Sequence, residues 1–298
     1  MTKLKKYKLF RSLILSRHPS HSILRAKNQT LPLLPFRSVI RLGSTTELQD
    51  TILKGGTRVE INTTEAVKNS ASKLLMKQKF TEAGVKTAEW YVYNHLGNGT
   101  NFTKQFPGKD DNTNLEGWEC FGREHLIYPI VAKSHFGSRG IGNTKFNNKE
   151  ELEAWLVGKN LNNYIFEEFV KMTREYRLHV TKFGCFYSCR KLVRNDAPEG
   201  TWQKHDDVCN WVLEDNPSFK KPKNWDDIVA DCIKAKDALG LDICAFDVGV
   251  QGSVDGVERE NPEWIIFESC SAPSFGNITG QKYIEILPKL LIDKYNNK

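Results

Sequence analysis

A lysine at the end of an apolar stretch, followed by a glycine-rich loop, is the first feature of the sequence that could do chemistry. The stretch 128–133 reads Tyr-Pro-Ile-Val-Ala-Lys and ends at Lys133, and the following loop, 134–142, contains three glycines. Glycines let backbone N–H groups surround an anion, and the lysine adds a positive charge. The spacing fits neither a Walker A loop nor a GxGxxG dinucleotide fingerprint. The pattern predicts a phosphate-binding loop, with a simple β-turn as the alternative.

The stretch 164–170, Tyr-Ile-Phe-Glu-Glu-Phe-Val, could hold a purine base. It is an apolar strand that ends in two acids and two apolar residues, and Glu175 follows shortly after it. Backbone groups at such a strand end can read the edge of a base, and Glu175 could bind the ribose hydroxyls. The alternative is an exposed strand end with solvated acids.

Two carboxylates lie in late apolar runs, Asp247 in the stretch 245–249 and Glu268 at the end of the stretch 265–268. A charge in so apolar a run is costly unless it is paired or binds a metal. Two hard oxygen ligands suit magnesium that bridges nucleotide phosphates. A buried ion pair with an arginine is the alternative.

The elements that must position these groups indicate a mixed α/β (α+β) protein. Apolar spacing predicts a helix over 64–83 capped by Thr63 or Thr64, and further helices at about 148–157, at 225–239 and at the carboxyl end. Strand patterns occur at 38–42, 127–133, 163–169, 243–250 and 264–268, and an antiparallel pair is expected at 176–182 and 185–193. Residues 94–117 are expected to form a loop, and a polar segment, 195–222, precedes the helix at 225–239.

Composition is that of an ordinary globular protein. The chain has 298 residues, of which 39% are hydrophobic and 27% charged, and no apolar run reaches the length of about 18 residues that a membrane helix needs. Its seven scattered cysteines form no CxxC pair. A reduced, cytoplasmic environment is therefore expected.

The positive charge is concentrated at the amino end. Residues 1–46 contain no acid and ten Lys or Arg residues, among them Lys3, Lys5, Lys6 and Lys8. Such a segment can be a transit peptide, a solvated basic face or a surface that binds a polyanion such as nucleic acid.

The order of these features resembles that of the ATP-grasp ligases. A strand lysine, a glycine-rich loop, a Glu-Glu-Phe-Val hinge, a basic strand, an Asp and then a Glu follow one another, and the resemblance covers about Val59 to Ile292. The stretches 61–73, 174–179 and 205–211 look most similar to the branch with the ribosomal-protein glutamate ligase and small phage-encoded relatives. The resemblance implies an ATP-grasp fold with a short α/β appendage at 1–60, an ATP-grasp domain at 61–298 and, within that domain, a lid subdomain at about 118–170.

The resemblance also implies roles for single residues, with ATP and Mg²⁺ (or Mn²⁺) as cofactors. The nucleotide would be bound by a set spread over the first two motifs, namely Lys73, Lys133, Ser138, Gly140, Glu167, Glu168, Phe169, Val170 and Glu175. The γ-phosphate and the developing acyl phosphate would face Arg177, Arg190 and Lys191, with Arg194 as a further candidate. Asp247 and Glu268 would bind the metal, and His205 would lie in a substrate loop.

The implied activity is ligation of a small-molecule or peptide carboxylate to an amine through an acyl phosphate. An ATP-grasp phosphotransferase and a non-catalytic nucleotide-binding module are the alternatives. The family usually follows its metal-binding Glu with an Asn two residues later, whereas this chain has Cys270. A thiol is a soft ligand and a poor partner for magnesium, so occupancy of a second metal position is in doubt.

Overall fold

The computed structural model places the chain in three β-sheets and five α-helices over the residues that it describes. These residues are 12–24, 38–47, 59–94, 101–105, 118–121, 126–137, 140–202, 207–254 and 257–297. Among them, no helix is long and apolar enough to cross a membrane. The mixed α/β prediction is confirmed.

The amino-terminal sheet has three parallel strands in the order β1 (Ser12–Ser16), β2 (Ser38–Leu42) and β3 (Val59–Ile61). A 3₁₀ turn, Pro19–Leu24, follows β1. The last helix of the chain, α6 (Asn277–Asn296), packs on this sheet and buries Tyr283, Leu287 and Leu290 with Ile40 and Ile61. The appendage predicted at 1–60 therefore shares its core with the carboxyl end of the chain, and its last strand ends at Ile61.

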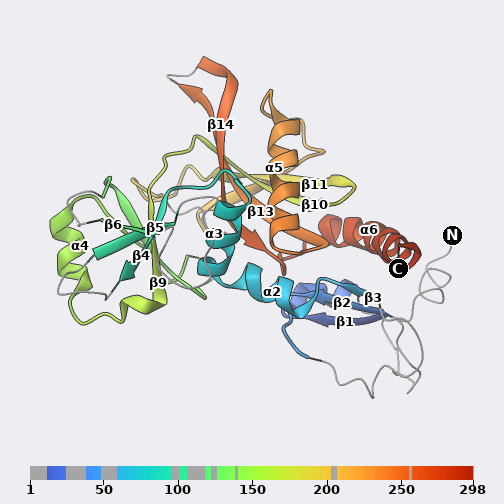
Figure 1. The fold of residues 1–298 in the computed structure, drawn as a ribbon. Coiled ribbons are helices and arrows are strands. Elements are labelled where there is room, and N and C mark those ends of the chain that lie inside the picture. Colours follow the sequence, from blue (N-terminus) through green and yellow to red (C-terminus); the bar gives the residue numbers. More distant parts are fainter. Residues whose placement is uncertain are drawn as a thin grey trace.

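The six-stranded sheet lies at the left of Figure 1 and has the order β6-β5-β4-β9-β7-β8. Its strands are β4 (Trp90–Asn94), β5 (Asn101–Gln105), β6 (Trp118–Phe121), β7 (Ile130–Ser134), β8 (Thr144–Phe146) and β9 (Tyr164–Glu168). Helix α4 (Lys149–Leu156) and the 3₁₀ turn Leu161–Asn163 complete it. Because β4 and β5 precede residue 118, this unit begins about Trp90, earlier than the predicted lid boundary, and β5 lies in a segment predicted to be a loop.

The central sheet is antiparallel throughout, with the order β12-β11-β10-β13-β14. Its strands are β10 (Arg174–Thr181), β11 (Gly184–Val193), β12 (Cys209–Leu213), β13 (Ile243–Val254) and β14 (Val257–Cys270). The pairing of β10 with β11 confirms the predicted antiparallel pair. Strand β12 lies in the segment 195–222, where no regular structure was predicted.

Alternation along the strands gives the central sheet two different faces. Tyr176, Leu178 and Val180 on β10, with Phe246 and Val248 on β13, point into a core covered by three helices. These helices are α2 (Thr64–Ala71), α3 (Lys73–Glu82) and α5 (Trp225–Ala238). The residues between them face the opposite side, so charged side chains there avoid the core.

The helix predicted at 64–83 is two helices, because Ser72 is extended (φ −92°, ψ 117°). Its side chain accepts a hydrogen bond from the Leu75 N–H at 3.3 Å and so caps α3, which is a favoured role of serine. Thr63 caps α2 by accepting from the Ala66 N–H at 3.2 Å, as predicted. In Figure 1, α3 lies between the six-stranded and central sheets.

Candidate active site

The non-core face of the central sheet carries a compact set of charges, which we call the site face: Glu175 and Arg177 on β10, Lys191 on β11, Asp247 on β13 and Glu268 on β14. Strand register brings them together, since Glu175 is opposite Lys191, Arg177 is opposite Asp247, and Asp247 is opposite Glu268. The structure thus brings together five of the predicted site residues, although they span almost a hundred positions of the chain.

Asp247 is bound by two cations. Nε and a terminal nitrogen of Arg177 donate to its two carboxylate oxygens at 2.7 and 2.8 Å, and Lys191 Nζ donates to one of them at 3.2 Å. Burial alone would raise the pKa of the Asp247 carboxyl, but Arg177 and Lys191 outweigh it and hold that pKa well below its ordinary value. The ion pair with an arginine, the alternative considered for Asp247, is therefore present, and the arginine is itself a predicted site residue.

Lys191 links Asp247 to Glu175, whose carboxylate accepts from Nζ at 2.5 Å. Burial would lower the pKa of Lys191, yet Asp247 and Glu175 raise it above its ordinary value, so the ammonium stays charged. Trp211 on β12 covers both cations, with its ring 4.9 Å from the Arg177 guanidinium carbon and 5.2 Å from Lys191 Nζ. Such cation–π contacts help to hold the two side chains. Sequence reasoning missed Trp211.

Lys73, at the first turn of α3, connects the site face to the glycine-rich loop. Its Nζ donates to Glu268 at 2.9 Å and to the Gly137 carbonyl at 2.7 Å. Its backbone N–H donates to the His135 carbonyl at 2.9 Å. The glycine-rich loop and Glu268 therefore meet at one residue, and its ammonium group contacts both Gly137 and Glu268.

Glu167 on β9 is buried and bound by two lysines. Lys133 on β7 contacts its Oε1, and Lys77 on α3 contacts its Oε2 at 2.8 Å. Burial would raise the pKa of the Glu167 carboxyl, but the two lysines lower it to about 2. The predicted role of Glu167 at a purine stays a prediction, and its observed contacts are with these lysines.

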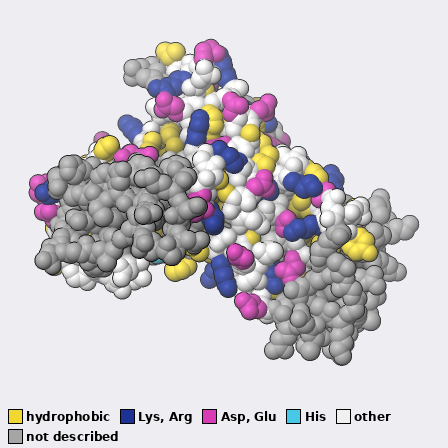
Figure 2. Space-filling model, viewed as in Figure 1, with side chains coloured by type: hydrophobic (Ala, Val, Ile, Leu, Met, Phe, Trp, Pro, Cys, Tyr) yellow, Lys and Arg dark blue, Asp and Glu magenta, His cyan; other side chains and the backbone are white. Residues whose placement is uncertain are grey.

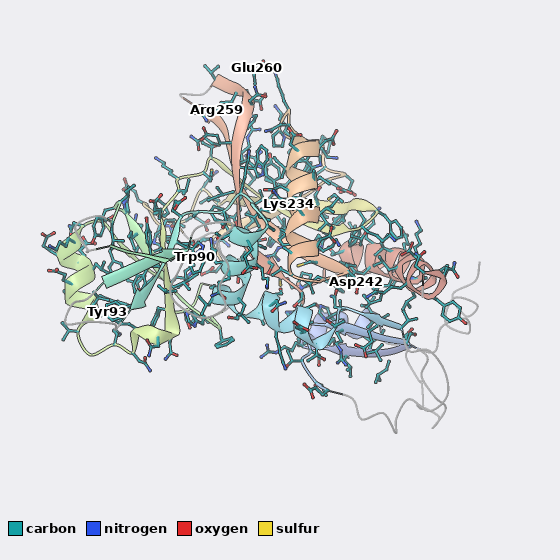
Figure 3. All side chains as sticks on the ribbon, viewed as in Figure 1. Trp90, Tyr93, Lys234, Asp242, Arg259 and Glu260 are labelled. Carbon is teal, nitrogen blue, oxygen red and sulfur yellow. The ribbon has the colours of Figure 1, made fainter. Side chains whose placement is uncertain are left out.

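The rest of the predicted hinge lies at the end of β9. Glu168 accepts from the Tyr91 hydroxyl at 3.2 Å, and the Phe169 N–H donates to the Pro129 carbonyl at 2.8 Å. The Phe169 ring lies 5.9 Å from that of Trp202 and 4.8 Å from Lys145 Nζ, and Val170 is half-buried. The six-stranded sheet is also joined to α3 by Trp90, labelled in Figure 3, whose indole N–H donates to the Thr81 hydroxyl at 2.9 Å.

An apolar surface adjoins the charges at Gly249, which the sequence did not single out. A β-bulge between Asp247 and Val248 leaves Phe267 without a partner on β13. A Cβ on Gly249 would lie 2.5 Å from the Phe267 ring and 2.6 Å from the Met172 side chain. Glycine is therefore required here for space, and it allows Phe267 and Met172 to lie beside the site face.

Four further predicted residues lie away from the site face or outside the described residues. Arg190 is opposite Tyr176 and shares its face, with the guanidinium carbon 6.0 Å from the Tyr176 ring, so it points away from Asp247. Gly140 lies in the glycine-rich loop with φ +67°, where its carbonyl accepts from the Asn143 N–H at 3.0 Å. Ser138 and His205 lie outside the described residues.

Of the side chains predicted to bind magnesium or to lie near it, the two carboxylates suit this ion and the thiol of Cys270 does not. Asp247 and Glu268 are opposed carboxylates, the ligand type that magnesium prefers. Cys270 lies opposite Ala245, and burial raises the pKa of its thiol, which disfavours a metal-binding thiolate. Over the described ranges, no group of three or more His, Cys, Asp or Glu side chains could hold a metal ion.

The loop after Cys270 is fixed by the amino-terminal segment. The His21 ring is hydrogen-bonded through Nε2 to the Pro273 carbonyl at 2.8 Å, and the Phe275 N–H donates to the Ser20 hydroxyl at 2.9 Å. Gly43 (φ +75°) lies so close to Ala272 that a Cβ would be 2.4 Å from the Ala272 methyl group. Segments more than 200 residues apart thus position the chain that leaves the site face.

Comparison with known proteins supports the fold. No protein-family model and no curated protein matches the sequence. Several solved structures do match. One is a D-alanine–D-alanine ligase from Bacillus anthracis, which is 14% identical with a TM-score of 0.55, and the match covers 95% of this chain and 94% of that chain. A RimK domain ATP-grasp protein from Sphaerobacter thermophilus matches at 14% identity with a TM-score of 0.52, over 94% of this chain and 99% of that chain. The ATP-grasp ligase PsnB, complexed with a minimal precursor, matches at 11% identity with a TM-score of 0.53, over 95% of this chain and 98% of that chain. The chain has the ATP-grasp fold.

The nucleic-acid partner considered for the basic amino end, one of three alternatives, gains no support. None of the three similar structures is described with a nucleic acid. Lys3, Lys5, Lys6 and Lys8 lie outside the described residues. On the face shown in Figure 2, Lys and Arg are interspersed with Asp and Glu over the described surface.

Proposed function

We propose that this protein is an ATP- and magnesium-dependent ligase that joins a carboxylate to an amine through an acyl phosphate. One observation carries the proposal: the Lys73 ammonium contacts both the Gly137 carbonyl of the glycine-rich loop and the Glu268 carboxylate. The glycine-rich loop, which would bind phosphate, and a carboxylate of the kind that binds magnesium are thereby adjacent. The similar structures are ligases or ATP-grasp proteins, which agrees with this function.

The nucleotide would lie between the two larger sheets. Lys133 and Lys73 would contact its phosphates, and Glu175 its ribose. The hinge, Glu168 to Val170, and the apolar surface of Phe267 and Met172 would frame the adenine. The contact of Phe267 and Met172 around Gly249 supports this placement, because it provides an apolar surface beside the charged site face.

Asp247 and Glu268 would hold magnesium, which supplies positive charge to the phosphates when bound. Arg177 and Lys191 would stabilise the negative charge on the transferring phosphoryl group, and both already lie on the same face as these carboxylates. Such fixed charges act mainly by positioning and electrostatics. Trp211 would help by covering the two cations and limiting their access to water.

The reaction would proceed in two steps. A substrate carboxylate oxygen attacks the γ-phosphorus of ATP, giving an acyl phosphate and ADP. The amine then attacks the acyl carbon, and the tetrahedral intermediate collapses with loss of inorganic phosphate and a proton. The glycine-rich loop would keep water from hydrolysing the acyl phosphate.

Cys270 favours one competing function, a nucleotide-binding module without turnover. The chain has a protonated thiol where the resembled family has a third metal ligand, which would weaken a second metal position. Release of ADP separates the two functions, because the module would bind Mg-ATP and release none.

The test combines binding and turnover. A panel of carboxylates and amines is screened for ADP release, with mass spectrometry of the products. Calorimetry with Mg-ATP then compares wild type with Lys133→Ala, which should weaken binding strongly because it removes a charge-assisted contact to phosphate. Glu167 keeps Lys77 in this variant, so the fold should survive. The control is Lys149→Ala on α4, which removes a surface pair with Glu153. Equal ATP affinity in all three proteins would refute the proposal.

A further inference from the structure

The pair of lysines on Glu167 has an unequal arrangement. Lys77 has a side chain only 1% exposed, while the Lys133 side chain is 14% exposed and stands on the strand that leads into the glycine-rich loop. Lys77 also donates to the Thr87 hydroxyl at 2.5 Å, and that hydroxyl donates to the Ile266 carbonyl at 2.9 Å. Lys77 is therefore fixed from two sides within the protein, and Lys133 is the more accessible partner.

The charges around the site are balanced except at Glu167. On the site face, Arg177 and Lys191 are matched by Asp247 and Glu175. Lys73 is matched by Glu268. Glu167, in contrast, contacts two lysines with its single negative charge. Within these described ion pairs, two lysines therefore share the single carboxylate of Glu167, an arrangement that suits the arrival of an anion next to Lys133.

We infer that Lys77 is a positioning residue, a permanent counter-ion of Glu167 that allows Lys133 to leave this carboxylate and bind the nucleotide phosphates. The inference rests on the proposed function, since it takes Lys133 to bind ATP. Without Lys77, the move of Lys133 to phosphate would leave the buried Glu167 carboxylate unpaired, which is costly. With Lys77 in place, Glu167 keeps one ion pair throughout.

The same contacts explain why Lys77 itself stays away from the nucleotide. Its ammonium is enclosed by Glu167 and Thr87, and Thr87 is fixed by β14. Lys73, one turn earlier on the same helix face, reaches the glycine-rich loop instead. The two lysines of α3 thus have different partners, and Lys77 acts on ATP only through Glu167 and Lys133.

The test is a cycle of variants measured by calorimetry with Mg-ATP. Lys77→Met removes the charge and keeps most of the length. It should weaken ATP binding by about tenfold or more, the size of change that 1.4 kcal/mol gives, because Lys133 becomes the only counter-ion of Glu167. The double variant Lys77→Met, Glu167→Gln should recover most of that loss, since no carboxylate then competes for Lys133. Lys79→Met, which removes an exposed pair with Glu82 on the same helix, is the control and should bind ATP like the wild type.

Turnover and stability separate positioning from general damage. The rate of Lys77→Met at saturating ATP should stay near the wild-type rate while its KM for ATP rises, because Lys77 does not contact the reacting atoms. If Lys77→Met does not fold, Glu167→Gln alone carries the test and should bind Mg-ATP at least as tightly as the wild type. Unchanged ATP affinity in Lys77→Met, a double variant as weak as the single one, or weaker binding in Glu167→Gln would overturn the inference. Wild type that binds no Mg-ATP would instead refute the proposed function.

Discussion

His179 should make the stability of this fold depend on pH between about 7 and 3. Its ring is 1% exposed and lies among the rings of Phe186, Tyr187 and Tyr283, and its Nδ1 is hydrogen-bonded to the Tyr283 hydroxyl at 3.1 Å. Burial, helped by the nearby Arg177 charge, lowers the pKa of His179 from 6.5 to about 3. The folded protein therefore holds this ring neutral.

The direction and size of the effect follow from that pKa. Between pH 6.5 and 3 the unfolded chain binds the His179 proton and the folded chain does not, so the free energy of unfolding falls as the pH falls. Each pH unit in this window removes about 1.4 kcal/mol. Between pH 7 and pH 5 the loss assigned to His179 is about 2 kcal/mol, because the titration begins only near pH 6.5.

The measurement is urea unfolding of wild type and His179→Gln at pH 7 and pH 5, followed by tryptophan fluorescence. Glutamine does not titrate and can keep a hydrogen bond to the Tyr283 hydroxyl. The variant will be less stable at pH 7, but it should lose about 2 kcal/mol less than the wild type on acidification. Other titrating groups are common to both proteins and cancel in this comparison. Equal losses in the two proteins would show that His179 is not held neutral by the fold.

Three further changes test the site face. Gly249→Ala should lower the free energy of unfolding by about 1–3 kcal/mol, because the added Cβ would meet the Phe267 ring and overpack the site. Adding Phe267→Leu to this variant should recover part of that loss, and urea unfolding of the two variants measures both effects. Glu268→Gln should abolish ADP release by removing negative charge from the proposed metal site, whereas Glu258→Gln, which removes an exposed partner of Arg174, should leave it unchanged. Cys270→Asn should preserve ADP release and lower the Mg²⁺ concentration for half-maximal rate, since an amide oxygen suits magnesium better than a thiol; loss of activity in a folded variant would show a positive role for the thiol.

Much of the site face could be predicted because it depends on short-range alternation. Glu175 and Arg177 differ by two positions, so an antiparallel strand places them on one face, and the hairpin at 182–184 brings Lys191 beside them. The same rule places Arg190, another of the catalytic candidates, on the opposite face of the sheet from Lys191. Arg190 and Lys191 are neighbours in sequence, and neighbours on a strand point to opposite faces. Once Lys191 faces Asp247, Arg190 must face the core beside Tyr176.

Other contacts could not be predicted because they depend on long-range packing. Lys73 and Glu268 are 195 positions apart, and no local pattern indicates that they form an ion pair. Lys77 reads in the sequence as an ordinary helix lysine, although its side chain is almost fully buried. The β-bulge leaves Phe267 of β14 without a partner on β13. It depends on how the two strands pair, so neither strand sequence alone predicts it. Ser72 breaks a continuous apolar helix pattern because its side chain caps the second helix.

Helix α3 is the element through which these distant contacts act together. Its first turn contacts the glycine-rich loop and Glu268 through Lys73, its second contacts Glu167 through Lys77, and its last is tied to the six-stranded sheet by Thr81 and Trp90. Lys73 and Lys77 are one helical turn apart, so a rigid helix fixes the separation of their partners. A phosphate that drew Lys133 from Glu167, as we infer, would leave the Lys77 and Thr81 contacts of α3 in place. In the proposed function, nucleotide binding would therefore rearrange the loop side chains while the carboxylates at the central sheet keep their positions, which would favour the alignment that phosphoryl transfer needs.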